Sequence, residues 1–352
     1  MLLGAGALAL MSQGARADEK LSRFVQAAAD STPPTMSEFK NVREFGATGD
    51  GTTDDTAAIQ AAVEGTGGAN RGTIYFPMGT YRTSSAITFE RPNLNIVFRG
   101  EPGATIAGEF DDFLLKRSPN SPISGIHAIE NLRIVNAHAK GRGVAFHSCV
   151  GGKIVNCHIS AWRGIETFNS QSVLVDTCSI VAPGASDTSV GIMAGNATAV
   201  IATDVTGYHH GIRHQNVGLI VYGGRYEVNA VALMIGMDEN GRTFQSSGFD
   251  ISGLSMEANQ TAIHIHAGAA GKISGLSIGG GVPLEYGLRL ATAQDVVVQG
   301  VSVGCSKGFS KAGIAIENAK RTVLMAVSSN SPTAWLLPED QSQISFIQTN
   351  KA

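Results

Sequence analysis

The sequence of 352 residues has few charged side chains, few aromatic side chains and little cysteine. Charged residues make up 16% and aromatic residues 6%, and the formal net charge is −3. No run of lysine or arginine occurs, which argues against nucleic acid as a partner. No apolar stretch beyond the first few residues is long enough to span a bilayer. Four cysteines are too few for a disulfide scaffold.

The N-terminus has the features of an export signal. Leu2–Met11 is a short apolar run, and Ala15-Arg16-Ala17 is the small-x-small pattern that a signal peptidase cleaves. We predict that residues 1–17 are a signal peptide, that residues 18–40 form a lead segment, and that the protein is secreted or periplasmic. The alternative is an ordered apolar segment at the N-terminus.

An internal repeat runs through most of the chain. Each copy has a glycine or alanine, an apolar residue, a variable residue and usually a second apolar residue, then a turn and a second β-rich run. The copies begin at Gly143, Gly164, Gly191, Gly211, Ala232, Ala262, Gly287 and Gly313. Their spacing ranges from 20 (191 to 211) to 30 (232 to 262) residues. This spacing and the β-branched, alternating runs are typical of a parallel β-helix.

The repeat defines one predicted β-helix domain over residues 41–330. Within it, Met237–Gly248 is polar and turn-rich, which predicts a surface loop. The rhythm ends after Asn330. Residues 331–352, which contain two prolines, are predicted to form a tail that covers the far end of the solenoid.

The segment before the repeats carries a distinctive motif. Residues 41–62 read NVREFGATGDGTTDDTAAIQAA, and residues 72–81 read GTIYFPMGTY. This segment resembles the opening of the pectate-lyase-like superfamily, which includes rhamnogalacturonase- and epimerase-related proteins and phage tailspikes. The resemblance, specific to about Gly108, implies an all-β fold, a single right-handed parallel β-helix with a short N-terminal capping helix.

Local chemistry agrees with a helix in this segment. Asp54, Asp55 or Thr56 would cap a helix, the glycine-rich stretch 65–68 would end it, and its apolar stripe would be Ala58, Ile59, Ala62 and Val63. The carboxylates of Asp50, Asp54 and Asp55 would also suit calcium. Turn and capping chemistry is the commoner role of such aspartates, so calcium is the alternative and no other cofactor is predicted.

Alternation within each copy predicts which side chains face outward. Residues two and four after the leading glycine or alanine should point out, and equivalent residues in successive coils stack about 4.8 Å apart. Glu166 and Arg213, two coils apart, would then have backbones about 10 Å apart. The two outward rows contain Glu166, Arg213, His264 and Arg289 in one, and Phe168 and His266 in the other.

Aromatic and basic residues flank these rows. Flat aromatic faces suit sugar rings, while histidine and arginine supply protons and positive charge. The sequence therefore predicts a groove for a polysaccharide. Its predicted substrate-binding residues are Trp162, Arg163, Phe168, His209, Tyr222, His264 and Arg289.

Uronate lyase chemistry fits the same region. A positive group must neutralise the substrate carboxylate, and a base must remove the proton from the neighbouring carbon. Arg213 is the candidate for the first role and His210 or Tyr208 for the second, with Glu166 as a further catalytic candidate.

Glycoside hydrolysis instead needs two carboxylates roughly 5 to 10 Å apart. Glu166 lacks an obvious second carboxylate unless Asp204, Glu227 or the pair Asp238-Glu239 reaches it, and the Asn-Thr-Asp signature of related polygalacturonases is missing. The leading prediction is an exported polysaccharide lyase acting on an acidic, uronate-containing glycan. A hydrolase or epimerase of the same fold and a non-catalytic glycan-binding β-helix are the alternatives.

Two local pairs have open interpretations. His264 and His266 would hold a metal or form a solvated pair, and the second reading is favoured because no third ligand is in sight. Cys157 and Cys178, one coil apart, would form stacked thiols or a disulfide. His214 falls at an inward position, which predicts a core histidine.

Overall fold

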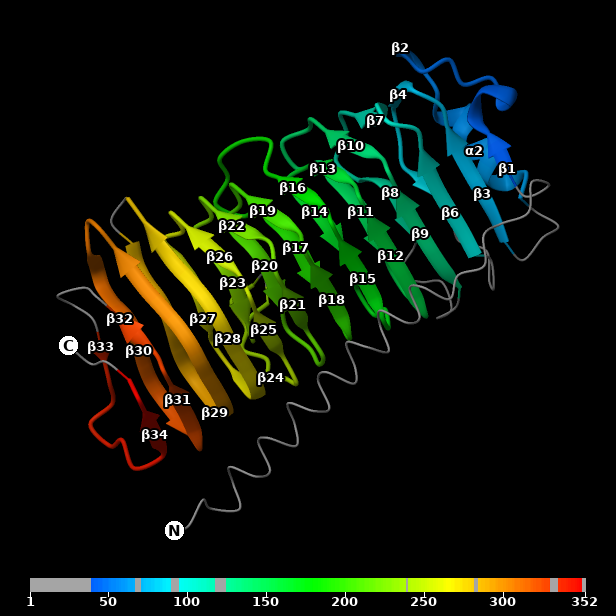
Figure 1. Ribbon diagram of the computed structural model, residues 1–352. Coiled ribbons are helices and arrows are strands. Elements are labelled where there is room, and N and C mark those ends of the chain that lie inside the picture. Colours follow the sequence, from blue (N-terminus) through cyan, green and yellow to red (C-terminus); the bar gives the residue numbers. More distant parts are fainter. Residues whose placement is uncertain are drawn as a thin grey trace. The chain divides into compact units, whose positions relative to one another are not determined.

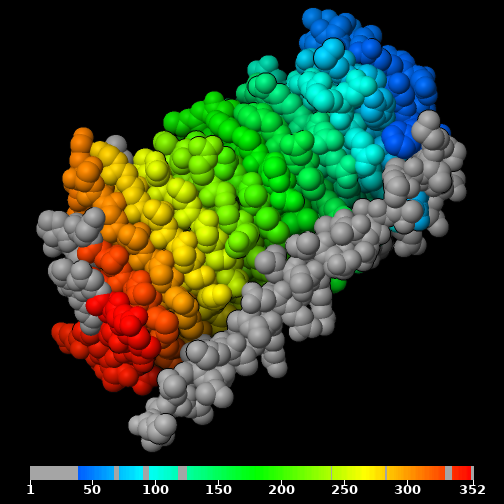
Figure 2. Space-filling view, in the orientation of Figure 1, coloured from blue at the N-terminus to red at the C-terminus, as the bar shows by residue number. Residues whose placement is uncertain are grey.

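The computed structural model describes residues 39–66, 71–89, 95–117, 125–238, 240–281, 284–329 and 335–349. The predicted signal peptide and nearly all of the lead segment lie outside these residues. The described chain forms two compact units, an N-terminal unit that ends at Tyr208 and a C-terminal unit that begins at His209. In each unit, neighbouring coils of the chain lie in contact, so that their colours form successive bands (Figure 2).

The N-terminal unit opens with a cap. The 3-10 helix η2 (Val42–Phe45) and helix α2 (Thr56–Glu64) follow strand β1 (Phe39–Asn41), and α2 buries Ile59, Ala62 and Val63 against the first coils. The helix lies at the start of the stacked strands (Figure 1). The predicted capping helix is therefore confirmed.

The aspartates of this cap make turn and loop contacts. Asp50 accepts hydrogen bonds from the backbone N–H groups of Thr52 and Thr53 at 2.8 Å, which lowers its pKa. Asp55 does not cap α2 through its side chain; instead its carboxylate accepts from the backbone of Thr48 and Gly49, at 2.7 and 3.0 Å. Their oxygens are thus engaged by the protein's own backbone.

Strands continue the N-terminal unit, mostly three to a coil (Figure 1). They are β2 (Asp50–Asp54), β3 (Arg71–Phe76), β4 (Gly79–Thr83), β5 (Ile87–Thr88), β6 (Asn95–Gly100), β7 (Ala104–Gly108), β8 (Phe113–Arg117), β9 (Ile126–Glu130), β10 (Arg133–Asn136), β11 (Arg142–Phe146), β12 (Gly151–Val155), β13 (His158–Ser160), β14 (Arg163–Glu166), β15 (Val173–Asp176), β16 (Ser179–Val181), β17 (Val190–Ala194), β18 (Thr198–Ile201) and β19 (Asp204–Thr206). Parallel pairing joins them into three stacks, for example β8–β11–β14–β17, β9–β12–β15–β18 and β10–β13–β16–β19.

The C-terminal unit repeats this arrangement. Its strands are β20 (His210–His214), β21 (Ile220–Tyr222), β22 (Arg225–Glu227), β23 (Val231–Ile235), β24 (Ser246–Ser247), β25 (Asp250–Ser252), β26 (Ser255–Glu257), β27 (Thr261–Ile265), β28 (Gly268–Gly280), β29 (Leu284–Cys305), β30 (Phe309–Lys320), β31 (Thr322–Met325), β32 (Ser328–Ser329), β33 (Trp335–Leu336) and β34 (Ile344–Ile347). One stack runs β20–β23–β27–β29–β30–β33, and β34 adds to β31. Both units are parallel β-helices, which confirms the predicted all-β fold class.

Left-handed corners divide each coil. In most coils the second β-rich run of a repeat, read as one stretch from the sequence, is two strands separated by two residues, the first of which has a positive φ. Asn156, Thr177 and Ala202 occupy this corner in the N-terminal unit, with φ of 52°, 51° and 45°. Glycine, which takes positive φ without steric cost, occupies it at Gly223 and Gly253 in the C-terminal unit.

Inward side chains form the core of each unit. The residue after each leading glycine or alanine is fully buried, and these residues stack in parallel register, as alternation predicts. They are Val144, Ile165 and Ile192 in one unit, and Ile212, Leu233, Ile263, Leu288 and Ile314 in the other. His214 is also fully buried, so the predicted core histidine is confirmed.

Candidate functional site

A histidine and an arginine form the centre of the site in the C-terminal unit. His210 begins β20 and Arg213 lies three residues on, and Arg213 Nη2 is 3.1 Å from each ring nitrogen of His210. Both side chains are buried. Burial, then the positive charge of Arg213, lowers the pKa of His210 to about 2. A neutral imidazole therefore lies beside a buried guanidinium.

An outward row runs from Arg213 across the following strands. Arg213 is in register with Met234, Met234 with His264, and His264 with Arg289, which confirms the stacking predicted within this unit. Burial, then the charge of Arg289, lowers the pKa of His264 to about 4. Because His264 is also buried, the reading of a solvated histidine pair is wrong for this residue.

Arg289 lies in a cluster of charges and an aromatic ring. Its guanidinium donates two hydrogen bonds to Glu317, at 2.6 and 3.2 Å, and lies 5.2 Å from the ring centroid of Tyr286. Lys311 Nζ is 5.3 Å from the same centroid and pairs with Glu285 at 3.1 Å. This cluster places two cations beside one aromatic ring on β29 and β30.

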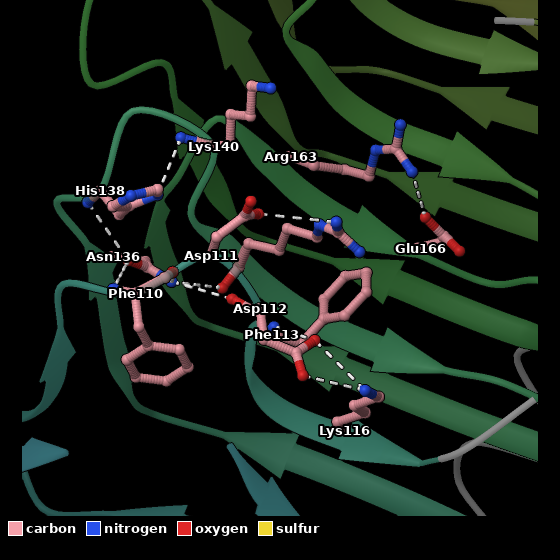
Figure 3. Close-up of polar contacts among 11 residues, drawn as sticks. Phe110, Asp111, Asp112, Phe113, Lys116, Asn136, His138, Lys140, Arg163 and Glu166 are labelled. Carbon is pink, nitrogen blue, oxygen red and sulfur yellow. Dashed lines mark hydrogen bonds and ion pairs between the residues drawn. The ribbon is translucent and has the colours of Figure 1, made fainter. Parts of the chain in front are cut away.

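The N-terminal unit holds a separate charged cluster around Glu166 on β14. Arg163 Nη1 donates to Glu166 Oε2 at 2.7 Å, as Figure 3 shows, and His147 Nε2 lies 2.9 Å from Oε1. Burial alone would raise the pKa of Glu166, but the hydrogen bond from His147 and the charge of Arg163 lower it to about 2. Glu166 is therefore an ionised carboxylate with both oxygens engaged.

His147 is a site residue that sequence reasoning missed as a functional candidate. It falls at an outward position of its repeat, the same position that holds Phe168 in the next one, and the two rings pack edge to face at 6.0 Å. Both His147 and Glu166 fall at outward positions of successive copies, and this placement was the signal in the sequence that the two side chains meet.

The structure brings other predicted residues into these clusters. Trp162 lies under Arg163, with Arg163 Cζ 5.1 Å from its ring centroid, and its indole N–H donates to Ser186 Oγ at 3.2 Å. The His209 ring packs against that of His210, with centroids 4.4 Å apart. Trp162 and His209 therefore lie in the two clusters, and their predicted contact with a sugar stays a prediction.

Two predicted residues lie elsewhere. Tyr208, predicted as an alternative base to His210, is buried, and its hydroxyl donates to the carbonyl of Ala161 at 3.0 Å. Burial raises the pKa of Tyr208 far above its usual value, so it is a core side chain and not an exposed base. Tyr222 is about half exposed at the end of β21, a different strand of its coil from the one that carries Arg213.

Metal-ligating side chains do not converge in the part of the chain that the structure describes, where no group of three or more His, Cys, Asp or Glu residues could hold an ion. Asp50, Asp54 and Asp55 are engaged in the turn contacts of the cap, and His266 pairs with Thr243 at 2.9 Å. The described helices also include none with the length and apolar character needed to cross a membrane.

The fold and these outward clusters define a parallel β-helix protein of the pectate-lyase-like kind. The family described as rhamnogalacturonase A/epimerase, pectate lyase-like, matches residues 39–278, more than half of the chain, and the chain belongs to this family.

Individual relatives match over shorter stretches. The chain is 59% identical over 44 residues to the mannuronan C5-epimerase AlgE1 and to alginate lyase 7, both of Azotobacter vinelandii. These matches cover 12% of this chain and only 3% and 5% of the two relatives. Among solved structures, PfbA, a surface adhesin of Streptococcus pneumoniae, is similar with a TM-score of 0.61 at 13% identity, covering 88% of this chain and 91% of that chain. The last likeness is one of fold.

Proposed function

We propose that the protein is an exported enzyme that cleaves an acidic, uronate-containing polysaccharide by elimination, and that Arg213 and His210 carry the reaction. The observation that carries the proposal is the buried contact of 3.1 Å between a guanidinium and an imidazole held neutral. Elimination next to a carboxylate needs these two groups side by side, one positive and one able to accept a proton.

The proposed reaction begins when the uronate carboxylate binds beside Arg213. The guanidinium stabilises the negative charge that develops as the adjacent C–H bond breaks, and His210 accepts that proton. The electron pair forms a carbon–carbon double bond, the glycosidic C–O bond breaks, and the leaving oxygen takes a proton from water. The carboxylate also offsets the charge of Arg213, the second cause of the lowered pKa of His210 after burial, and so raises that pKa.

His264 and Arg289 extend the same row and are proposed to contact sugar residues beyond the reacting one. Their positive or polar groups recur at the coil spacing of about 4.8 Å, so a polymer lying across the strands meets them in turn. Tyr222 is proposed as a separate exposed aromatic surface for the polymer, on β21, which belongs to a different stack of strands from Arg213. Tyr208 is left out because its hydroxyl donates to the carbonyl of Ala161, inside the core.

Hydrolysis is less well supported than elimination. It requires a carboxylic acid that gives a proton to the leaving oxygen, which calls for a raised pKa. Glu166 has a pKa of about 2, and both of its oxygens are engaged by His147 and Arg163. An epimerase would share the first proton abstraction and differ in returning a proton to the opposite face.

The test is to incubate the purified protein with acidic and neutral polysaccharides and follow the ultraviolet absorbance of the conjugated unsaturated uronate. We expect absorbance with an acidic glycan, and its loss in His210→Gln and Arg213→Ala. His158→Gln and Arg321→Ala are matched controls in which activity is retained.

Other outcomes would replace the proposal. New reducing ends without absorbance would identify a hydrolase. Solvent deuterium entering the sugar without absorbance would identify an epimerase. Binding with no chemical change would identify a glycan-binding protein. Export is tested separately, by finding whether the mature N-terminus follows Ala17 when the gene is expressed with its first codons intact.

A further inference from the structure

Two arginines on adjacent coils of the N-terminal unit share one unusual environment. Arg142 on β11 is in register with Arg163 on β14, which places their backbones about 4.8 Å apart. Arg142 Cζ lies 5.3 Å from the ring centroid of Phe113, and Arg163 Cζ lies 5.1 Å from that of Trp162. Each guanidinium therefore lies over an aromatic ring, an arrangement that fixes its plane.

The two arginines differ in how firmly a carboxylate holds them. Arg163 binds Glu166 at 2.7 Å and its side chain is 12% exposed. Arg142 lies 3.6 Å from Asp111, and these side chains are 34% and 50% exposed. Figure 3 shows Arg163 paired with Glu166, and Asp111 on the neighbouring loop. Among the described residues Asp111 is the one carboxylate within ion-pair distance of Arg142, and the buried Nε of Arg142 has no hydrogen-bond partner there.

Asn136 holds this region in place. Its buried amide donates to the carbonyls of Phe110, Asp112 and Arg142, at 3.1, 3.0 and 3.2 Å. Its oxygen accepts from the backbone N–H groups of Phe110 and His138 (Figure 3). The loop that carries Asp111 and the strand that carries Arg142 are thus joined by one side chain, so the guanidinium is presented on a fixed backbone.

We propose that Arg142, with Arg163 beside it, is a binding site for the anionic group of an acidic oligosaccharide, and that this anion displaces Asp111. A guanidinium binds carboxylate and sulfate through the same parallel pair of N–H donors, so both groups fit. Arg163 keeps its bond to Glu166 and contributes charge and position. Trp162 lies at the site and reports its occupancy.

The choice of an acidic glycan as ligand follows from the proposed function, but binding here is independent of the elimination step. The measurement therefore uses the Arg213→Ala variant, in which the proposed catalytic pair is removed. If the protein turns out not to catalyse elimination, the binding measurement still tests the site at Arg142. If no binding is found at Arg142, the absorbance assay still tests elimination.

The chain has two tryptophans, Trp162 and Trp335. Adding Trp335→Phe leaves Trp162 as the fluorescent reporter. An oligouronate, a sulfated oligosaccharide and a neutral oligosaccharide of equal length are titrated while tryptophan fluorescence is followed, with anisotropy of the labelled sugar as an independent measure of affinity.

We expect saturable binding of an anionic oligosaccharide that weakens with added salt. Arg142→Ala should weaken it by about tenfold, since a charge-assisted hydrogen bond is lost. Asp111→Asn should tighten it several-fold, because the competing carboxylate is removed. The oligouronate and the sulfated sugar tell which anion is preferred.

The matched control is Arg99→Ala. Arg99 lies in the same unit, has a similar exposure and pairs with Glu130, but among the described residues its guanidinium lies over no aromatic ring. The affinity of this variant should equal that of the parent. The proposal is overturned by absence of binding, by equal binding of the neutral sugar, by equal losses in Arg99→Ala and Arg142→Ala, or by an Asp111→Asn variant that binds no more tightly. Circular dichroism of each variant confirms that it is folded.

Discussion

His147 and Glu166 meet across two adjacent coils, with His147 Nε2 2.9 Å from Glu166 Oε1. The two residues are 19 positions apart in the sequence (166 − 147), and they face each other because β11 and β14 pair in parallel. Arg163 binds the other oxygen of Glu166. Two largely buried side chains, His147 and Arg163, thus depend on one carboxylate.

Removal of that carboxylate should destabilise the N-terminal unit. Glu166→Ala leaves Arg163 and His147 covered without their partner, and breaking such a pair costs roughly 3 kcal/mol. The half-buried pair Arg99–Glu130 offers the comparison, since it is more exposed than Glu166 and its partners and Glu130→Ala should cost about 1 kcal/mol. Urea unfolding of both variants measures the difference. Equal losses would show that coverage of Glu166 contributes nothing.

Buried neutral histidines should make the protein less stable in acid. The folded-state pKa is lowered from 6.5 to about 3 for His127 and to about 4 for His264, in both cases chiefly by burial. The unfolded chain therefore binds more protons below pH 6.5, and stability falls as pH drops from there towards the folded pKa values, by about 1.4 kcal/mol per pH unit for each such proton.

This slope can be measured residue by residue. Urea unfolding of the parent and of His127→Gln is compared between pH 4.5 and 8, above the range where Glu166 is protonated. The glutamine oxygen can still accept the hydrogen bond that the Ile96 N–H donates to His127 Nδ1. Below pH 6.5 the free energy of unfolding of the variant should fall less steeply with decreasing pH than that of the parent, by the contribution of one proton. Above pH 7.5 the two free energies should differ by a constant amount. Parallel curves over the whole range would contradict the prediction.

Asn136 and Gly141 should be energetically coupled. Asn136→Ala leaves several backbone groups without a partner, each worth about 1 to 3 kcal/mol where buried. Gly141→Ala should also destabilise, because its Cβ would lie 2.2 Å from the Asn136 side-chain oxygen. In the double variant that overlap is gone, so the second substitution should cost less than it does alone. A double-mutant cycle measures the coupling, and strict additivity would refute it.

The cysteines should be unreactive in the folded protein and free once it unfolds. All four are buried free thiols. Burial raises the pKa of Cys149 to about 11, and the hydrogen bond with Cys178, then burial, raises the pKa of Cys157 above its usual value. Iodoacetamide should label none in buffer and four in denaturant, counted by intact mass. Two labels in denaturant would instead indicate a disulfide, the alternative that the sequence leaves open for Cys157 and Cys178.

Much of the fold follows from the sequence because it is defined by two local patterns, the alternation of apolar residues within each copy and the recurring glycine or alanine that begins it. Alternation fixes which side chains face inward, and the stacked Ile212 and Leu233 obey it. The corners are different. Asn156, Thr177 and Ala202 share a backbone conformation and no side-chain chemistry, so no residue pattern marks the division of each run into two strands.

The candidate site was predictable in part. Arg213 and His210 are three residues apart, so the sequence places them in one region, although alternation alone would put them on opposite faces. The burial of Tyr208 was missed although Tyr208 has the same parity as the inward Ile212. The pairing of Arg142 with Arg163 also had a signal, because each directly precedes the leading glycine of its repeat. Which carboxylate each arginine would take depends on loop geometry, and sequence does not encode that in any simple spacing.

The left-handed corners have a consequence for insertions and deletions. Losing one residue from a strand inverts its inward and outward faces from that point onward. In this chain the inversion can travel only to the next corner, where the backbone changes direction and the alternation starts again. Each corner therefore acts as a reset point that confines the effect of a length change within a strand to that one short strand.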